Sequence, residues 1–407
     1  MPPELTLVAA VDEAPVDEVG IVDAIRDAAA RREPLHIEGR GTKRGMLRPV
    51  QAARGLSTRN LTGITLHAPQ ELIVSARAGT TLPELEAKLA EGGQGLTSEP
   101  PDLSGLLGSM GPQSIGGVVA TNLSGPRRVA WGATRDHVMG VRAINGSAEL
   151  IRSGGRVLKN VTGLDLCKLI AGSHGTLAVL TEVTLKVLPV AELTGSLVLR
   201  GLGARRAVAA LSAALGSPFG VSGAAWLPAG AAARVPELEG VGDVAVVRIE
   251  DFALSVDYRL GRLAGDLAEF GVAARLAHDA SLAVWRAIRD VVPLDAPVED
   301  AVWRISVRPS AGPGVIAAVE AAGARGFLDW GGGLVWVAGA PALHSRVIAA
   351  ACLGGGVWTV LRAPDTMRAA VDVVPSEPEA LARITRRVKA AMDPFGILNP
   401  GRITAGL

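Results

Sequence analysis

The chain of 407 residues has 48% hydrophobic and 20% charged residues and a net charge of +1. Its length predicts two domains, and its near-neutral charge, with no basic stripe or acidic tail, argues against nucleic acid and anionic membrane surfaces as partners. Its two cysteines, Cys167 and Cys352, stand far apart, which excludes a disulfide framework, a cysteine zinc site and an iron–sulfur cluster built by this chain alone.

The first half of the chain is expected to alternate helices with short strands. Residues 1–10 lack the basic and apolar regions of a signal peptide, and no apolar run approaches the roughly 18 residues of a membrane span. Apolar periodicity predicts an amphipathic helix over residues 16–32. A second helix is expected over residues 82–91, with Pro83 in its first turn. Strands are expected over residues 34–38, 63–66, 72–78, 138–144, 147–152 and 177–187.

Two loops of this half carry distinct signals. The Asn145-Gly146 pair between two predicted strands indicates a hairpin with a type I′ turn, in which both residues take a positive φ. Residues 99–128 are rich in Gly, Pro and Ser and show little periodicity. Because so long a loop inside a compact domain is usually functional, we expect a binding role for it.

The composition changes after about residue 190, which indicates a second domain of α+β type. Helices are predicted over residues 204–215, 256–270 and 381–392, and strands over residues 244–249 and 302–307. We therefore expect a first domain over residues 1–190, a second over residues 191–385, and a C-terminal segment over residues 386–407.

Three glycine-rich segments could contact a nucleotide. Residues 37–45 (IEGRGTKRG) follow a predicted strand, and glycines there let backbone N–H groups face a phosphate. The segment is not a Walker A loop and is a poor Rossmann fingerprint, because Arg44 replaces the third glycine and no helix follows. An ordinary surface turn is an equal alternative. Residues 114–125 (SIGGVVATNLSG) could form a second arm of a dinucleotide site, and residues 171–183 alone indicate only a glycine turn before a buried strand.

The order of these three segments and the closing Asn399-Pro400-Gly401-Arg402 resembles the FAD domain of the vanillyl-alcohol-oxidase superfamily. Residues 98–101, 125–128, 157–166, 303–306, 329–332 and 393–402 resemble the FAD-binding E subunits of bacterial glycolate oxidase. The resemblance implies an α+β fold, in which a two-subdomain FAD-binding domain of the PCMH type precedes an α+β cap domain. Residues 102–114 form a longer connection than is usual in that family, which leaves the placement of this loop open.

The resemblance also implies a cofactor, FAD, and its contacts. The pyrophosphate is expected to contact Gly39, Arg40, Gly41, Thr42 and Lys43, and the next strand end would add Gly79 and Thr80. The isoalloxazine and ribityl chain would lie along Gly116, Gly117, Thr121 and Asn122, with Gly125 closing the loop. The adenine would lie near Glu182 and Val183, and Asn399 would reach the flavin from the C-terminus. No histidine lies in the first glycine loop, so we expect non-covalent FAD, with His67 and His137 as remote candidates for a link.

The implied reaction is oxidation of glycolate or D-lactate to the 2-oxo acid in a complex with a D-type flavoprotein and an iron–sulfur F-type subunit. The implied localisation is cytoplasmic, or peripheral at the inner face of the cell membrane through those partners. Arg304 and Arg308 are candidates for holding a carboxylate or the reduced flavin, because a guanidinium fork matches two oxygens. Structural ion pairs are an equal alternative for both arginines.

A metal site is not expected, since only His278 and His344 follow residue 190, whereas relatives that oxidise 2-hydroxy acids share a histidine-rich motif there. We therefore expect turnover only with both partners present. Two alternatives remain open: a stand-alone FAD-dependent oxidoreductase for a 2-hydroxy acid or alcohol, and a non-catalytic flavoprotein scaffold.

Overall fold

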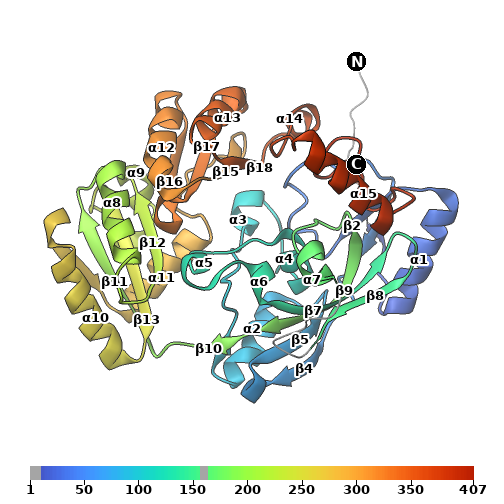
Figure 1. Cartoon of the computed structure of the whole chain (residues 1–407), viewed down its shortest axis with the longest axis horizontal. Coiled ribbons are helices and arrows are strands. Elements are labelled where there is room, and N and C mark those ends of the chain that lie inside the picture. Colours follow the sequence, from blue (N-terminus) through green and yellow to red (C-terminus); the bar gives the residue numbers. More distant parts are fainter. Residues whose placement is uncertain (1–10, 156–163) are drawn as a thin grey trace.

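The computed structural model describes residues 11–155 and 164–407, so most of the resemblance segment 157–166 lies outside the described residues. Its elements form two lobes (Figure 1). The first lobe holds a parallel three-stranded sheet and an antiparallel five-stranded sheet, and the second holds an antiparallel eight-stranded sheet. The mixed helix and sheet content agrees with the predicted α+β class.

The first lobe is built from the following elements. Its three-stranded sheet has the order β1 (Val11–Glu13), β3 (Arg54–Ser57), β2 (Leu35–Glu38), and its five-stranded sheet the order β4 (Ile64–Ala68), β5 (Ile73–Arg77), β9 (Ala178–Lys186), β7 (Val138–Asn145), β8 (Leu150–Gly154). A small ribbon pairs β10 (Leu188–Pro189) with β6 (Gln94–Gly95). Its helices are α1 (Glu18–Arg31), α2 (Leu82–Glu91), α3 (Ser104–Leu107), α4 (Ile115–Thr121), α5 (Arg128–Trp131), α6 (Thr134–His137) and α7 (Leu166–Ile170).

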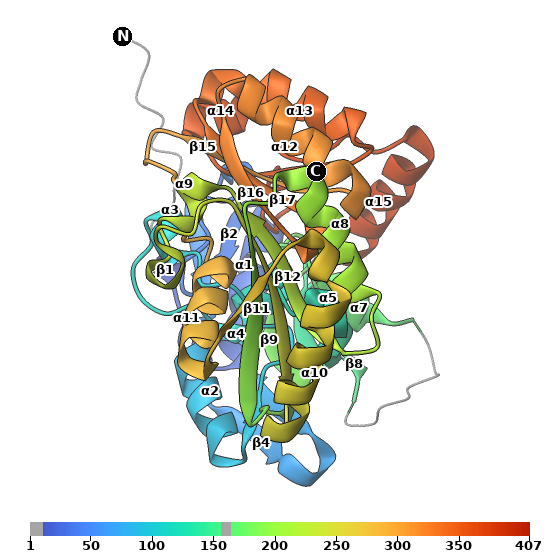
Figure 2. The same cartoon turned by 90° about the vertical axis from the view of Figure 1, so that its left-hand side faces the viewer.

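The second lobe continues without a break in the chain. The strand order in its sheet is β14 (Ala273–Leu276), β11 (Leu193–Arg200), β13 (Val244–Asp251), β12 (Val221–Leu227), β16 (Arg325–Asp329), β17 (Leu334–Gly339), β15 (Ala301–Ser306), β18 (Val357–Arg362). The helices of this lobe are α8 (Ala204–Leu215), α9 (Ala229–Ala232), α10 (Ala253–Asp266), α11 (His278–Arg289), α12 (Gly312–Ala321) and α13 (His344–Leu353); α14 (Asp365–Ala370) and α15 (Glu379–Met392) follow in the chain. Figure 2 shows α8, α10 and α11 running alongside the strands.

The two faces of the eight-stranded sheet have different partners. A Cβ on Gly195 would touch Leu260 of α10, whereas the next residue, Ser196, receives a hydrogen bond from Trp285 of α11. Successive strand residues point to opposite faces, so Arg248, which pairs with Ser196 across the strands, shares the α11 face. Arg248 also forms an ion pair with Glu99 of the first lobe. This inner face of the sheet therefore meets the first lobe.

The C-terminal segment returns to the first lobe. Figure 1 shows α15 lying beside that lobe rather than on the large sheet, and Leu398 forms a parallel bridge with Leu35 of β2. The predicted boundary at residue 385 lies inside α15, and the division into domains at residues 190 and 385 stays a prediction.

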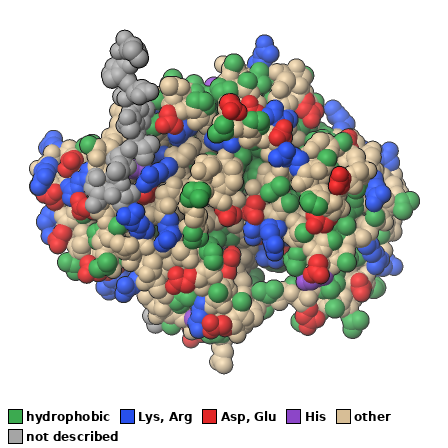
Figure 3. All heavy atoms as spheres, turned by 180° about the vertical axis from the view of Figure 1, so that it is seen from behind, with side chains coloured by type: hydrophobic (Ala, Val, Ile, Leu, Met, Phe, Trp, Pro, Cys, Tyr) green, Lys and Arg blue, Asp and Glu red, His purple; other side chains and the backbone are tan. Residues whose placement is uncertain are grey.

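Most predicted elements are confirmed. The helix over residues 204–215 has the predicted bounds, and the helix over residues 256–270 is divided between α10 and a short 3-10 turn. Among the described residues, none of the helices combines the length and apolar character that a membrane crossing requires. Figure 3 shows basic and acidic side chains interspersed over one face of the molecule, as a near-neutral chain would have.

Two local predictions are wrong. The segment 99–128 contains α3 and α4 rather than only a loop, because Ser114 caps α4 and Gly116 packs against Ala78 at the end of β5. The turn after β7 is not of type I′: the residue with a positive φ, 59°, is Ala148. The Asn145 side chain accepts hydrogen bonds from the backbone of Ser147 and Glu149 instead.

Candidate functional site

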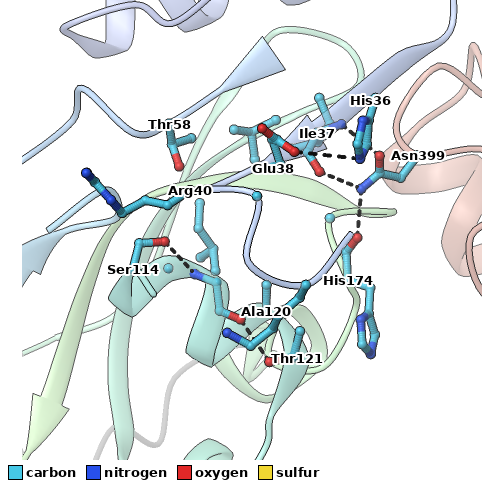
Figure 4. A pocket seen from close by; sticks show the side chains of 18 of the residues that line it. His36, Ile37, Glu38, Arg40, Thr58, Ser114, Ala120, Thr121, His174 and Asn399 are labelled. Atoms are coloured by element: carbon cyan, nitrogen blue, oxygen red, sulfur yellow. Dashed lines mark hydrogen bonds and ion pairs between the residues drawn. The ribbon is translucent and has the colours of Figure 1, made fainter. Parts of the chain in front are cut away.

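A cavity opens at the carboxyl end of β2, and we call it the β2 cavity (Figure 4). It holds about 760 Å³ of empty volume, part of it open to solvent. Its walls come from β2 and the glycine loop after it, from α4, from the turn before β9, and from the C-terminal segment. The lining consists of His36, Ile37, Glu38, Gly39, Arg40, Gly41, Thr42, Lys43, Arg44, Thr58, Ser114, Gly116, Gly117, Ala120, Thr121, Ser173, His174, Gly175, Ala178, Val179, Leu180, Asn399 and Arg402.

The glycine loop is held open by local interactions. Arg44 donates two hydrogen bonds to Glu38, at 2.5 and 2.6 Å, which ties the end of the loop back to β2. A Cβ on Gly39 would lie only 2.3 Å from the Ser114 hydroxyl, so glycine lets the loop lie against α4. Gly41 has a φ of +74°, a conformation that glycine adopts without a steric penalty. The loop therefore presents its backbone to the cavity.

Two lining cations have neutral hydrogen-bond partners. The Lys43 ammonium donates to the Gln113 side chain at 2.6 Å, and the Arg402 guanidinium donates to the carbonyls of Lys43 and Arg48 at 2.8 and 3.0 Å. Burial lowers the pKa of Lys43 to about 8 and that of Arg402 to about 10. The neutral carbonyls and the amide offset the positive charge of these two side chains only in part. A diphosphate suits such a site, because hydrogen bonds between ionised partners are stronger than those to neutral ones.

On the wall formed by α4, the helix backbone is exposed to the cavity at Gly117. A Cβ on Gly117 would come within 3.4 Å only of the hydroxyl of its own helix cap, Ser114, so the position is open toward the cavity. In the turn bonded to the end of α4, Ser173 has a buried hydroxyl with no hydrogen-bond partner within the described residues. Buried polar groups in native proteins are nearly always paired, so this hydroxyl fits a ligand that supplies the missing partner.

Asn399 joins two walls of the cavity. Its amide accepts a hydrogen bond from the Ile37 N–H at 2.7 Å and donates to the carbonyls of Ile37 and His174 at 2.9 and 2.8 Å. Figure 4 shows it between β2 and the His174 turn. The buried Lys389 holds the same segment through Asp393 and the carbonyls of Thr176 and Leu398. The C-terminal segment thus completes the cavity.

The histidines of the lining are kept neutral. Burial lowers the pKa of His36 to about 4 and that of His174 to about 3. Both rings are therefore uncharged near neutral pH, and the positive potential of the cavity comes from lysine and arginine.

The structure brings together nine of the residues that the sequence predicts for FAD. These are Gly39, Arg40, Gly41, Thr42, Lys43, Gly116, Gly117, Thr121 and Asn399. The other six, Gly79, Thr80, Asn122, Gly125, Glu182 and Val183, lie outside this lining. Gly79 lies directly behind it, since a Cβ there would be 2.1 Å from the carbonyl of the lining residue Thr58.

Sequence reasoning did not assign several lining residues. Ser173 and His174 belong to the third glycine segment, whose far end, Glu182 and Val183, was expected to contact the cofactor instead. Arg402 ends the closing motif, where only Asn399 was assigned a role. The signal was thus present in both motifs, but which of their residues face the cavity depends on the folded backbone.

The two candidate arginines lie in different places. Arg304, on the inner face of the sheet, lies over the ring of Trp330 at 4.9 Å. Arg308 follows the end of β15 and lines another hollow with residues of α8, α12 and α13.

Comparisons with known proteins agree with this geometry. A family model described as an FAD binding domain matches residues 10–154. Glycolate oxidase subunit GlcE of Escherichia coli (strain K12) is 32% identical over 388 residues, which cover 95% of this chain and 97% of that protein. The chain belongs to the GlcE family. It is therefore an FAD-dependent oxidoreductase of the expected fold class, with a PCMH-type FAD-binding domain.

Members of related families match shorter parts of the chain. D-lactate dehydrogenase of Archaeoglobus fulgidus is 30% identical over 157 residues, 38% of this chain and 33% of that protein. Among solved structures, 4-ethylphenol oxidase from Gulosibacter chungangensis has a TM-score of 0.70 at 13% identity, covering 96% of this chain and 89% of that one. At this identity the likeness shows the fold alone, and that fold is the one implied by the sequence.

Proposed function

We propose that this GlcE-family chain is the FAD-binding subunit of a complex that oxidises glycolate or D-lactate to the 2-oxo acid. The substrate would lose two electrons and two protons, and FAD, when bound, accepts the electrons. The observation that carries the proposal is the β2 cavity, in which the glycine loop, α4 and Asn399 meet in a chain similar to GlcE along nearly its whole length.

The lining suggests how each part of the cavity would hold FAD. The backbone of residues 39–43, with Lys43 and Arg402, would bind the diphosphate, and the Ser173 hydroxyl would gain a hydrogen-bond partner. Gly117 would allow close approach of the cofactor along α4, whereas the missing Cβ of Gly116 lets that helix pack against Ala78. The binding would be non-covalent: His67 and His137 do not line the cavity, and the His67 ring is hydrogen-bonded to Gln94.

Histidines of the second lobe have structural partners. The His278 Nδ1 accepts a hydrogen bond from the Thr194 N–H at 2.9 Å, and the His344 Nδ1 accepts one from the Trp303 indole at 3.2 Å. Each imidazole therefore has a structural partner of its own, and the two histidines do not form a common site. This supports turnover that depends on a D-type flavoprotein and an iron–sulfur F-type subunit, which would carry the electrons away.

Anaerobic mixing tests this function. The purified chain is mixed with glycolate or D-lactate while the flavin absorbance is followed, first alone and then after addition of both partner subunits. We expect the flavin of the isolated chain to stay oxidised and to bleach once the partners are present. Rapid bleaching of the isolated chain, followed by repeated turnover with a dye, would favour the stand-alone enzyme, and an unreduced flavin within an active complex would favour the scaffold.

A further inference from the structure

Trp330 is the centre of a cationic cluster between the lobes. The guanidinium carbons of Arg128 and Arg304 lie 4.8 and 4.9 Å from the centroid of its ring. Its indole N–H donates to the Gly125 carbonyl at 3.1 Å, which ties the second lobe to the loop after α4. The residue follows β16 with a φ of +54°, an uncommon conformation for a bulky side chain. The ring is therefore held firmly in place, and it brings two cations near one another.

These two arginines differ from their neighbours in lacking acceptors. Over residues 11–155 and 164–407, neither guanidinium donates a hydrogen bond to the protein or pairs with a carboxylate. Arg248, on the same face of the sheet, also stacks on a tryptophan, but it donates to both carboxylate oxygens of Glu99 at 2.9 Å. An arginine has five N–H donors, and Arg248 uses four of them on Glu99 and Ser222, whereas Arg304 and Arg128 have donors to spare.

Two acidic residues offset this charge only in part: Asp136 acts on Arg128, and Asp329 acts on Arg304. Asp329 precedes Trp330 and uses one carboxylate oxygen to accept a hydrogen bond from the Trp330 N–H at 2.7 Å. Burial raises the pKa of Asp329 to about 7, so near neutral pH it is partly protonated. Burial, with added repulsion from Arg128, lowers the pKa of Arg304 to about 10. The cluster therefore carries net positive charge in a poorly solvated place.

Arg304 remains reachable by a small molecule. Arg304 is only partly buried, and it lies at the lobe interface, because it shares the Trp330 ring with Arg128 of the first lobe. Paired residues share a face of the sheet, so Arg304 shares one with Trp336 and Phe327. This is the inner face of Arg248 and its partner Gly223, because Leu328, next to Phe327, pairs with Trp226, three positions from Gly223. Donors without partners, net positive charge and a partly exposed guanidinium at the lobe interface together describe a site for an anion.

We propose that Arg304, supported by Arg128, binds the carboxylate of a small organic acid at the lobe interface. The guanidinium fork of Arg304 matches the two oxygens of one carboxylate, and Arg128 adds positive potential over the same tryptophan. The choice of a 2-hydroxy acid such as glycolate as the natural ligand rests on the proposed function. The existence of the carboxylate site does not, because it follows from the unpaired arginines.

The test measures binding, not turnover. Acetate and glycolate are titrated into the FAD-loaded protein by calorimetry and thermal melting, against sodium chloride of matched ionic strength. Acetate carries the carboxylate but no hydroxyl to oxidise, so its binding is independent of the reaction. We expect saturable binding of both acids, a loss of at least tenfold in affinity in Arg304→Met, a smaller loss in Arg128→Met, and partial retention in Arg304→Lys, which keeps the charge but not the fork.

Two control variants complete the test. Arg346→Met, on the exposed surface of α13, should leave the affinity unchanged, and Arg308→Met separates the two arginines that the sequence suggested together. If Arg304 were only structural, Arg304→Met would lower the melting temperature and FAD content and leave the acetate affinity unchanged in the folded fraction. That result, an equal loss in Arg308→Met, or no binding beyond that of chloride would overturn the proposal. Saturable acetate binding by a chain whose complex never oxidises glycolate would overturn the proposed function alone.

Discussion

Gly117→Val should weaken FAD binding while leaving the chain folded. A Cβ at this position would meet the Ser114 hydroxyl at 3.3 Å, and no positive φ constrains it. Inside a helix, alanine is favoured over glycine by about 0.5–1 kcal/mol, and valine is also the better helix former. The apo-protein should therefore tolerate both Gly117→Ala and Gly117→Val, and the added methyl groups would extend into the β2 cavity.

The expected loss of FAD affinity follows from the direction in which these methyl groups extend. If bound FAD contacts the backbone here, the added methyl groups overpack the complex by about 1–3 kcal/mol, which is roughly a 5- to 150-fold rise in Kd, larger for valine than for alanine. The assay removes FAD, confirms folding by circular dichroism, and titrates FAD back while following quenching of flavin fluorescence.

Two glycines serve as comparisons. A Cβ on Gly116 would lie 2.7 Å from the Ala78 Cβ and 2.8 Å from its carbonyl oxygen, so Gly116→Ala should impair folding itself. Gly265, in α10, faces open space, and Gly265→Ala should leave FAD binding unchanged. An unaltered Kd for FAD in a folded Gly117→Val protein would refute the placement of the cofactor along α4.

Three further outcomes are expected. Asn399→Ala leaves the buried backbone groups of Ile37 and His174 without hydrogen-bond partners. It should therefore lower the free energy of unfolding in urea by about 3 kcal/mol or more and weaken FAD binding. A variant that unfolds at the same urea concentration as the wild type would contradict this. Because burial lowers the pKa of His36 to about 4, protons bind the unfolded chain preferentially, and stability should fall as the pH drops from about 6.5 toward 4, by about 1.4 kcal/mol per pH unit. Parallel pH profiles for wild type and His36→Gln would argue against that assignment. Acid precipitation should release yellow flavin into the supernatant, and flavin retained in the pellet would show a covalent link.

The sequence predicted elements well where local signals and tertiary packing agree. The helix α2, with Pro83 in its first turn, and the alanine-rich helix α8 both have the predicted bounds. It missed α4 because Gly116 and Gly117 are poor helix formers, and the packing of Gly116 against Ala78 outweighs that preference. It misjudged the turn after β7 because Gly146 packs against Asp393, a contact that no local signal reveals.

In the candidate site, too, the sequence predicted the features with a local signal and missed those that depend on distant contacts. The glycine loop was found because glycines directly after a strand are a local feature. Arg402 was not assigned, because its acceptors, the carbonyls of Lys43 and Arg48, are more than 350 positions away in the chain. Arg304 was proposed together with Arg308 from residue type alone, and only the fold shows that Arg304 lies over Trp330 while Arg308 lines a different hollow.

The most direct test of the account is glycolate-dependent dye reduction, compared between the isolated chain, the complex with its D-type and F-type partners, and the same complex carrying Gly117→Val. The account predicts turnover by the intact complex, little by the isolated chain, and a loss in the variant complex that matches its loss of FAD from this subunit. Comparable turnover by the isolated chain, or full turnover by a complex in which this subunit holds no FAD, would contradict it.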